Sequence, residues 1–306
     1  MRLLVTGGLG FIGSCFIRQY ITQAEILNID KIGYASQPEA LEHAATAPSY
    51  RFKKLDLATE ILELEVFAFR PDWIIHFAAE SHVDNSIATP EHIVTNNVMS
   101  TLKVLQAARR DNIKTLLVST DEVFGEGVFT ETTPYDPHNP YSASKACGDL
   151  IANAYHHTFD TPVIVTHSSN NFGEWQHREK LIPTALRAIC QGKPVPIYGT
   201  GQNVRDWIYV EDHCSAIWHL LEHGKLGQHY CIGARVALTN VSLMSHIFRI
   251  VKDLRPDLNP QYEFVKDRPG HDTRYTILPD KIEALGWKPQ HDFEVALRKT
   301  IEFYLR

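Results

Sequence analysis

The strongest constraint on the fold is a glycine-rich turn near the start of the chain. A short apolar strand, Leu-Leu-Val, runs directly into Gly7, Gly8, Gly10 and Gly13, the last three with the spacing G-x-G-x-x-G, and a helix is expected over residues 15–21. Side chains at these positions would block both the tight turn and the approach of a pyrophosphate to the helix N-terminus. The turn therefore indicates a dinucleotide-binding unit, although this spacing alone is weak evidence.

A second strand, expected over residues 25–29, ends at Asp30. A carboxylate at this place accepts hydrogen bonds from an adenosine ribose, and it favours NAD over NADP because a 2′-phosphate would meet like charge. Lys31, next to Asp30, slightly weakens this exclusion of NADP. The alternative is an aspartate at a strand end that only faces water, which would make the glycine turn a coincidence.

Strands and helices then alternate along the first half of the chain. Further strands are expected at 50–55, 73–77, 116–118 and 163–166, and helices at 57–70 and 90–111. This order predicts an α/β fold with a doubly wound parallel sheet of the Rossmann type. The cofactor should lie at the carboxyl ends of the strands.

Beyond residue 166 the elements become shorter and richer in proline and glycine. We therefore expect a dinucleotide-binding domain at 1–170 and a smaller α/β substrate-binding domain at 171–306. The chain is expected to return to the first domain near 207–232.

Composition excludes several classes of function. The chain has 306 residues, 44% hydrophobic and 22% charged, with a formal net charge of -6, so no basic surface for nucleic acid is expected. The first apolar run is too short for a signal peptide or membrane span, which predicts a cytoplasmic protein. Five separated cysteines are typical of buried, reduced thiols, and the sixteen histidines lack the spacing of a metal site.

Candidate catalytic residues follow the strand at 116–118. Thr120, Asp121 and Glu122 stand at its end, and Tyr141 and Lys145 are four residues apart, on one face of an expected helix. An ammonium beside a phenol favours the phenolate, which can take a proton from a sugar hydroxyl. Two carboxyl groups of unequal pKa can divide the acid and base roles of a dehydration. A tyrosine and lysine at this spacing are, by themselves, more often part of a solvated helix face.

These motifs resemble the extended short-chain dehydrogenase/reductase family. Within it, the segment Ser-Thr-Asp-Glu-Val-Phe-Gly at 119–125 is similar to the active-site segment of the dTDP-glucose 4,6-dehydratases. The segments 76–84, 169–173, 205–213 and 267–272 also resemble that group, so the similarity runs from Val5 to Tyr275.

The resemblance implies a set of binding residues. For NAD these are Gly7, Gly10, Phe11, Ile12, Gly13, Asp30, Lys31, Ile32, Gly33, Asp56, Leu57, Ala78, Ala79, Glu80, Ser81, Asn96, Tyr141, Lys145 and Asn171. For a nucleotide sugar they are Ser81, Thr120, Asn170, Lys180, Leu181, Pro196, Ile197, Tyr198, Arg205, Asn240, Asp267, Arg268, Pro269, Gly270 and His271. Lys180, Arg205 and Arg268 also suit the neutralisation of a diphosphate, although single surface cations are usually only solvated. A homodimer through a four-helix bundle is implied as well.

The expected reaction converts dTDP-glucose into dTDP-4-keto-6-deoxyglucose and water. In this hypothesis Tyr141, assisted by Thr120 and Lys145, takes the C4 hydroxyl proton while NAD accepts the C4 hydride. Glu122 then removes the C5 proton, Asp121 protonates the leaving C6 hydroxyl, and the hydride returns to C6. The alternatives are another nucleotide sugar such as UDP-glucose, a 4-epimerase, which has no use for the paired carboxyls, and a non-catalytic NAD-binding protein.

Four departures from the family pattern are visible. Residues 174–178, Glu-Trp-Gln-His-Arg, replace a proline-containing stretch on the nucleotide side, which leaves the base of the substrate open. Phe124 replaces a tyrosine, and Gly33 and Asn96 each replace a threonine. None of these changes affects the five candidate catalytic residues.

Overall fold

The computed structural model describes residues 1–267 and 271–306, and a seven-stranded sheet forms the centre of its larger part. The strand order is β11-β7-β5-β4-β1-β2-β3, and all neighbouring strands are parallel. The strands are β1 (Arg2–Thr6), β2 (Glu25–Asp30), β3 (Tyr50–Lys54), β4 (Trp73–His76), β5 (Lys114–Thr120), β7 (Val163–Ser168) and β11 (His229–Ile232). The predicted doubly wound parallel sheet is confirmed.

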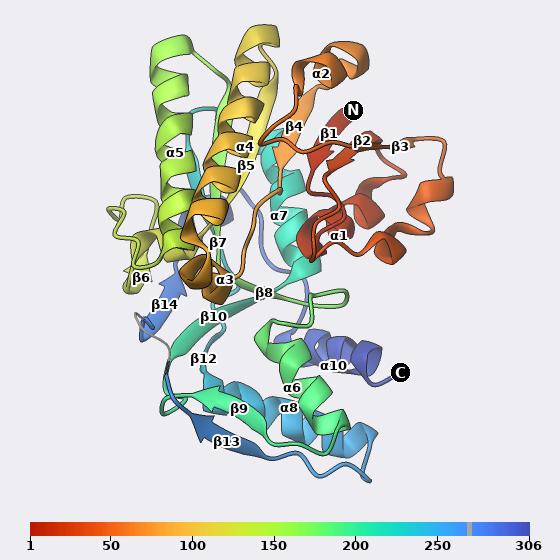
Figure 1. Ribbon diagram of the computed structural model, residues 1–306, viewed down its shortest axis with the longest axis vertical. Coiled ribbons are helices and arrows are strands. Elements are labelled where there is room, and N and C mark those ends of the chain that lie inside the picture. Colours follow the sequence, from red (N-terminus) through yellow and green to blue (C-terminus); the bar gives the residue numbers. More distant parts are fainter. Residues whose placement is uncertain (268–270) are drawn as a thin grey trace.

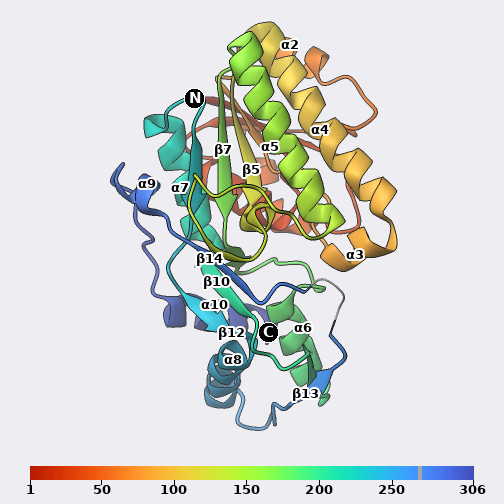
Figure 2. The same cartoon turned by 90° about the vertical axis from the view of Figure 1, so that its left-hand side faces the viewer.

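Both faces of this sheet are covered by helices, as alternate residues of β1 show. Leu3 and Val5 belong to one apolar core and Leu4 to the other, and all three side chains are fully buried. On the first face lie α1 (Phe11–Tyr20) and α7 (Val210–His223), and on the second lie α2 (Glu63–Phe69), α4 (Pro90–Asp111) and α5 (Pro140–Phe159) (Figures 1 and 2).

The strand order reverses direction between β1 and β4. From β1 the chain proceeds to β2 and β3 on one side, and the later strands are added on the other side. Parallel sheets of this kind bind ligands in the crevice at such a reversal, beyond the carboxyl ends of the strands. The loops after β1, β2, β4 and β5 therefore border a natural binding site.

The smaller part of the molecule lies below that crevice in Figure 1. It contains a sheet in the order β12-β10-β14-β6, in which β8 also pairs with β10, and a two-stranded sheet of β13 and β9. These strands are β6 (Gly127–Phe129), β8 (Asn170–Phe172), β9 (Val195–Tyr198), β10 (Val204–Tyr209), β12 (Ala237–Thr239), β13 (Tyr262–Val265) and β14 (Arg274–Ile277).

The remaining helices of the described chain are α3 (Val83–Ala88), α6 (Leu181–Cys190), α8 (Asn240–Leu254), α9 (Asp280–Glu283) and α10 (Phe293–Tyr304), with short 3₁₀ helices η1 (Pro38–Leu41), η2 (Ala44–Thr46) and η3 (Asp121–Phe124).

The chain crosses between the two parts more than once. Strand β10 continues without a break into α7, which packs on the large sheet and leads to β11 at its edge. The crevice is therefore closed from below by segments that are covalently joined to the sheet above it.

Several predicted element boundaries were wrong. The helix expected over 57–70 begins only at Glu63, because Asp56 accepts a hydrogen bond from the Ala58 amide in a turn. Helix α1 begins at Phe11, directly after Gly10, and not at residue 15. Cys190 is exposed rather than buried.

Candidate active site

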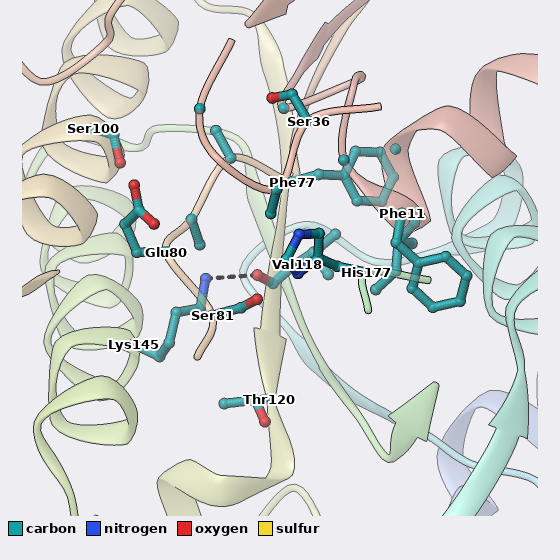
Figure 3. A pocket seen from close by; sticks show the side chains of 18 of the residues that line it. Phe11, Ser36, Phe77, Glu80, Ser81, Ser100, Val118, Thr120, Lys145 and His177 are labelled. Atoms are coloured by element: carbon teal, nitrogen blue, oxygen red, sulfur yellow. Dashed lines mark hydrogen bonds between the residues drawn. The ribbon is translucent and has the colours of Figure 1, made fainter. Parts of the chain in front are cut away.

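A cavity lies at the carboxyl edge of the large sheet. It contains all five candidate catalytic residues, and every residue predicted to bind NAD except Ile32 lines it. Of the predicted sugar-nucleotide residues, Ser81, Thr120, Asn170 and Lys180 line it. Residues that sequence reasoning missed include Tyr34, Ala35, Ser36, Ser100, Gln176, His177 and Glu179. Figure 3 shows part of this wall.

The glycine turn after β1 is shaped by close backbone contacts. Gly7 has a φ of +70°, and a Cβ there would lie 2.6 Å from the Cα of Ala78, while a Cβ on Gly13 would lie 2.5 Å from the carbonyl oxygen of Gly7. Helix α1 follows with Gly10 as its N-cap and no side chain that caps it. The positive end of α1 therefore opens directly onto the cavity, where it suits an anion such as a pyrophosphate.

Asp30 organises the loop that borders the turn. Its buried carboxylate accepts hydrogen bonds from the Leu9 amide over 3.0 Å, from the Ile32 amide over 2.8 Å and from the Ser36 hydroxyl over 3.1 Å. Asp30 therefore holds the glycine turn and the loop after β2 together while still lining the cavity. Ile32, by contrast, is 45% exposed and does not line the cavity.

Lys31 is neutralised within the same wall. Its Nζ lies 2.8 Å from Glu80 Oε1 and 3.0 Å from Asn96 Oδ1, and Asn97 fixes the backbone of Glu80 through two hydrogen bonds. Because Glu80 already pairs with Lys31, the lysine offers little attraction to a 2′-phosphate. The wall near Asp30 thus suits a free ribose hydroxyl.

The segment 174–180, of which residues 174–178 depart from the family pattern, closes the cavity from the smaller part of the molecule. The Trp175 carbonyl accepts a hydrogen bond from Gln37 over 2.5 Å, Glu179 accepts one from Tyr34 over 3.0 Å, and Lys180 donates to the Ser81 carbonyl over 2.7 Å.

The same segment is also held from below. Glu174 accepts a hydrogen bond from Tyr209 over 2.8 Å and pairs with Lys299 of α10 over 3.4 Å. Segment 174–180 therefore connects α10 to the loop after β2. Local sequence motifs do not predict these long-range contacts, although the unusual composition of residues 174–178 sets the segment apart in the sequence.

The candidate catalytic residues come from two adjacent elements. Strand β5 ends at Thr120, whose hydroxyl accepts a hydrogen bond from the Glu122 amide over 3.3 Å and so starts η3. Helix α5 begins at Pro140 with a capping box from Asn139. The side-chain nitrogen Nδ2 of Asn139 also donates to Glu122 Oε2 over 3.5 Å. The start of α5 is thereby brought to the end of β5.

Asp121 and Glu122 occupy different environments although they are neighbours in the chain. Asp121 is 2% exposed, and its Oδ2 has no hydrogen-bond partner among the described residues. Burial, followed by the charges of Glu122 and Asp206, raises the pKa of Asp121 well above its usual value. Glu122 is only partly buried. Asp121 is therefore suited to donate a proton, and Glu122 to accept one.

The Tyr141 and Lys145 pair behaves differently from the expectation. Burial and then the Glu122 carboxylate raise the pKa of Tyr141, whereas burial lowers the pKa of Lys145. Lys145 Nζ donates to the carbonyl of Val118 over 2.8 Å (Figure 3). Both side chains line the cavity, but burial and the Glu122 charge oppose formation of the phenolate.

Several residues predicted to bind the nucleotide sugar do not line the cavity formed by the described residues. In β9, Ile197 is 2% exposed within the apolar core, and Tyr198 points to the surface. Arg205 is buried, donates to the carbonyls of Val204 and Asp272 and lies over the Tyr275 ring at 4.1 Å. The others outside the wall are Leu181, Pro196, Asn240, Asp267 and His271. Arg268, Pro269 and Gly270 lie outside the described residues.

Two features are absent from the described part of the chain. No group of histidine, cysteine, aspartate and glutamate side chains in it is arranged to hold a metal ion. No helix within residues 1–267 and 271–306 has the length and apolar character needed to span a membrane.

Comparison with known proteins identifies the family. The model of the family described as GDP-mannose 4,6 dehydratase matches residues 4–300. The chain is 44% identical to dTDP-glucose 4,6-dehydratase of Haemophilus influenzae, with 100% of this chain and 98% of that protein covered. It is 40% identical to dTDP-glucose 4,6-dehydratase 1 of Escherichia coli, with coverage of 100% and 93%.

A solved structure agrees with the sequence comparisons. The crystal structure of dTDP-glucose 4,6-dehydratase from Streptomyces venezuelae, which has NAD bound, superposes with a TM-score of 0.94 at 40% identity and covers 100% of this chain and 97% of that one. The chain therefore belongs to the GDP-mannose 4,6 dehydratase family of extended short-chain dehydrogenases/reductases, and the resemblance to the dTDP-glucose 4,6-dehydratases is confirmed.

Proposed function

We propose that this protein is an NAD-dependent dTDP-glucose 4,6-dehydratase, a lyase that forms dTDP-4-keto-6-deoxyglucose and water. The observation that carries the proposal is the pair Asp121 and Glu122, one buried and one partly exposed, beside Tyr141 and Lys145 in one cavity. The similarity to dTDP-glucose 4,6-dehydratases over the whole chain supports the choice of substrate.

The cavity fits NAD on two structural grounds. The N-terminus of α1 lacks a capping side chain, so its first amides, at Phe11, Ile12 and Gly13, are suited to hold the pyrophosphate. Asp30 and the Lys31–Glu80 pair suit a ribose without a 2′-phosphate. When bound, NAD accepts a hydride from C4 of the sugar and returns it to C6, so the overall reaction has no net redox change.

Tyr141 acts as the base for the C4 hydroxyl, which lies within reach of Thr120 in this proposal. Since burial raises the pKa of Tyr141, the step requires positive charge beside the phenol, and Lys145, one helical turn further along α5, is placed to supply it. Thr120 orients the same hydroxyl by hydrogen bonding.

Dehydration uses the paired carboxyls. The C4 ketone acidifies the hydrogen on C5, and Glu122 accepts that proton as the C5–H electron pair forms the C5=C6 double bond. Asp121, protonated because of its raised pKa, gives its proton to the C6 oxygen, which leaves as water. Each of the two carboxyls therefore handles one proton of the elimination, and Glu122 gives its proton back to C5 when C6 is reduced, which completes the 6-deoxy product.

On the substrate side, Lys180 at the cavity wall is suited to bind the diphosphate. Ser81 and Asn170 in the same wall are suited to bind polar groups of the ligand. Arg205 is proposed to act on the site mainly through electrostatics, because its charge counteracts the raised pKa of Asp121. The base of the nucleotide contacts segments outside this wall.

The test is incubation of the purified protein with dTDP-glucose and UDP-glucose in parallel, followed by mass spectrometry of the product. Loss of one water from dTDP-glucose, at far higher efficiency than from UDP-glucose, is expected. A preference for UDP-glucose would keep the mechanism and change the base. Unchanged mass with both substrates, or conversion to an epimer of the same mass, would overturn the proposed dehydratase.

We also propose that the protein works as a cytoplasmic homodimer. Helices α4 and α5 pack against each other and expose apolar side chains, among them Val94 and Leu150, which suit pairing with a second copy in a four-helix bundle. All five cysteines are free, which fits a reducing compartment. Light scattering and cell fractionation test these two points.

A further inference from the structure

A buried carboxylate behind the active site takes no part in the steps proposed above. Asp149 lies on α5, one turn after Lys145 and two turns after Tyr141, so the three residues share one helix face. Its side chain is almost fully enclosed, and it does not line the cavity. A charge buried so deeply is costly unless it is compensated by hydrogen bonds or by opposite charge.

The hydrogen bonds of Asp149 connect α5 to the end of β5. Ser119 Oγ donates to Asp149 Oδ2 over 2.7 Å. Ser119 stands between Val118, whose carbonyl accepts the ammonium of Lys145 over 2.8 Å, and Thr120. The carboxylate and the ammonium of one helix therefore hold two consecutive residues, Val118 and Ser119, directly before Thr120 in the strand that carries the active site.

A polar network continues behind Asp149. His167 Nε2 of β7 lies 3.2 Å from Asp149 Oδ2, and the Tyr135 hydroxyl lies 3.2 Å from the same nitrogen. His229 of β11 stacks on His167, and burial lowers the pKa of His229 to about 4, so it is neutral at pH 7. Asn153 Oδ1 accepts a hydrogen bond from Nε2 of His229 over 2.7 Å, which closes the network.

We propose that Asp149 is a positioning residue for the dehydration, which keeps Lys145 charged and holds Lys145 and Thr120 at the level of Tyr141. The effect on turnover rests on the proposed function, whereas the effect on Lys145 does not.

Electrostatics supports this geometry. Burial lowers the pKa of Lys145, and the Asp149 charge opposes that shift. The Asp149 charge also raises the pKa of Tyr141, after the larger effects of burial and Glu122. Removal of the Asp149 charge therefore lowers the pKa values of both Tyr141 and Lys145. The acid limb of the pH profile of kcat, which reflects Tyr141, and the alkaline limb, which reflects Lys145, both move to lower pH. A simple loss of packing lowers activity without moving the limbs together.

Other ionisable groups face these residues and stay unchanged in the experiment. His76 of β4 faces Lys145 and is neutral, because burial lowers its pKa to about 3. Asp121 and Glu122 of η3 face Tyr141. His167, His229 and Tyr135 face Asp149 itself, as described above.

The decisive variant is Asp149→Asn in the NAD-bound protein. Asparagine with its side-chain oxygen in the place of Asp149 Oδ2 can still accept from Ser119 Oγ and from His167 Nε2, so both hydrogen bonds are kept while the charge is removed. Both limbs of the kcat profile should shift to lower pH by about one unit, with kcat on the alkaline side reduced roughly tenfold and KM little changed.

Two matched variants separate charge from packing. Asp149→Glu keeps the charge and should restore the position of both limbs. Asn153→Ala breaks the outer end of the same network without removal of a charge, and it should retain the limbs of the unmodified protein. If Asp149→Asn does not fold, as judged by circular dichroism, Asp149→Thr is the second neutral variant and still offers Ser119 an acceptor.

A direct readout needs no substrate. In protein with ¹³C-labelled lysine, the Lys145 resonance, assigned by its loss in Lys145→Met, should titrate at lower pH in Asp149→Asn than in the unmodified protein. An unchanged Lys145 titration together with unmoved limbs would overturn the proposal. If the unmodified protein forms no product but the Lys145 titration shifts, the proposed function fails while the role of Asp149 toward Lys145 stands.

Discussion

At the scale of single residues, burial distinguishes groups that are adjacent in the sequence. Asp121 is enclosed between η3 and the smaller sheet, whereas Glu122 lies at the cavity surface within reach of Asn139. The same backbone turn thus presents one buried carboxyl, whose pKa is raised, and one partly exposed carboxyl. The difference arises from the direction in which the 3₁₀ helix points each side chain, and it is the physical basis for their separate roles.

Replacement of the buried acid tests this assignment. Asp121→Asn cannot give a proton to the C6 oxygen, so the release of water should slow by a factor of roughly a hundred or more, the usual range for loss of a general acid. The measurement is the initial rate of product formation from dTDP-glucose by mass spectrometry. Asp136→Asn removes an exposed carboxyl nearby and serves as the control, and equal rates for both variants would contradict the role of Asp121.

The glycine turn offers a second test at residue scale. A Cβ on Gly13 would lie 2.5 Å from a backbone oxygen, so Gly13→Ala should lower the free energy of unfolding by about 1–3 kcal/mol and weaken NAD binding. Gly33 also borders the cavity, but a Cβ there lies at an ordinary 3.5 Å from Lys31, so Gly33→Ala is the matched control. Denaturant titration and calorimetric NAD binding check both, and equal effects would refute the steric argument.

At the scale of elements, segment 174–180 connects parts of the molecule that are distant in sequence. It contacts the loop after β2 through Gln37 and Tyr34, the loop after β4 through Ser81, and α10 through Lys299. These bonds span the opening of the cofactor cavity. The segment is therefore expected to slow the release of NAD, which suits an enzyme that retains its cofactor through the reaction.

Glu179 is the residue at which that expectation is most easily tested. It accepts a hydrogen bond from Tyr34 and lies 3.8 Å from His82, so Glu179→Ala removes two of the contacts between the segment and the larger part of the molecule. Loss of one or two such bonds should speed NAD release roughly five- to tenfold. Stopped-flow displacement of NAD measures the rate, and Glu222→Ala on α7, far from the cavity, should leave it unchanged.

At the scale of the whole molecule, the helices that shape the catalytic wall also form an outer flank. Helix α5 carries Tyr141 and Lys145 on its inner face, and α4 carries Asn96 and Asn97, which face the cofactor wall. The two helices lie side by side along one flank of the molecule (Figure 2), and both carry exposed apolar side chains. Pairing through this flank would stiffen the active site, so assembly and catalysis are expected to depend on each other.

A charge on the flank tests the assembly. Leu150 is 57% exposed on α5, and Leu150→Glu should convert the proposed dimer to a monomer, because a carboxylate within the proposed apolar interface would be costly to desolvate. Val295 on α10 is 65% exposed, and Val295→Glu is the matched control. Light scattering gives the mass, and a dimer that persists in Leu150→Glu would place the interface elsewhere.

Local patterns in the chain were sufficient for much of this protein. The glycine spacing, the acid at the end of β2, and the four-residue spacing of Tyr141 and Lys145 depend only on neighbouring residues, since strand ends and helix faces follow from local periodicity. Strand and helix alternation was likewise enough for the parallel sheet. The family motifs therefore predicted the sheet and the residues that gather at its carboxyl edge.

Tertiary structure alone decided the environment of those residues. Packing between distant elements buries Asp121, turns Lys145 toward the Val118 carbonyl and places Ile197 and Arg205 away from the cavity wall. It also brings Tyr34 to Glu179, which are 145 residues apart. Burial and long-range charge set pKa values and access, and both depend on which segments meet in space, so no local pattern contains them.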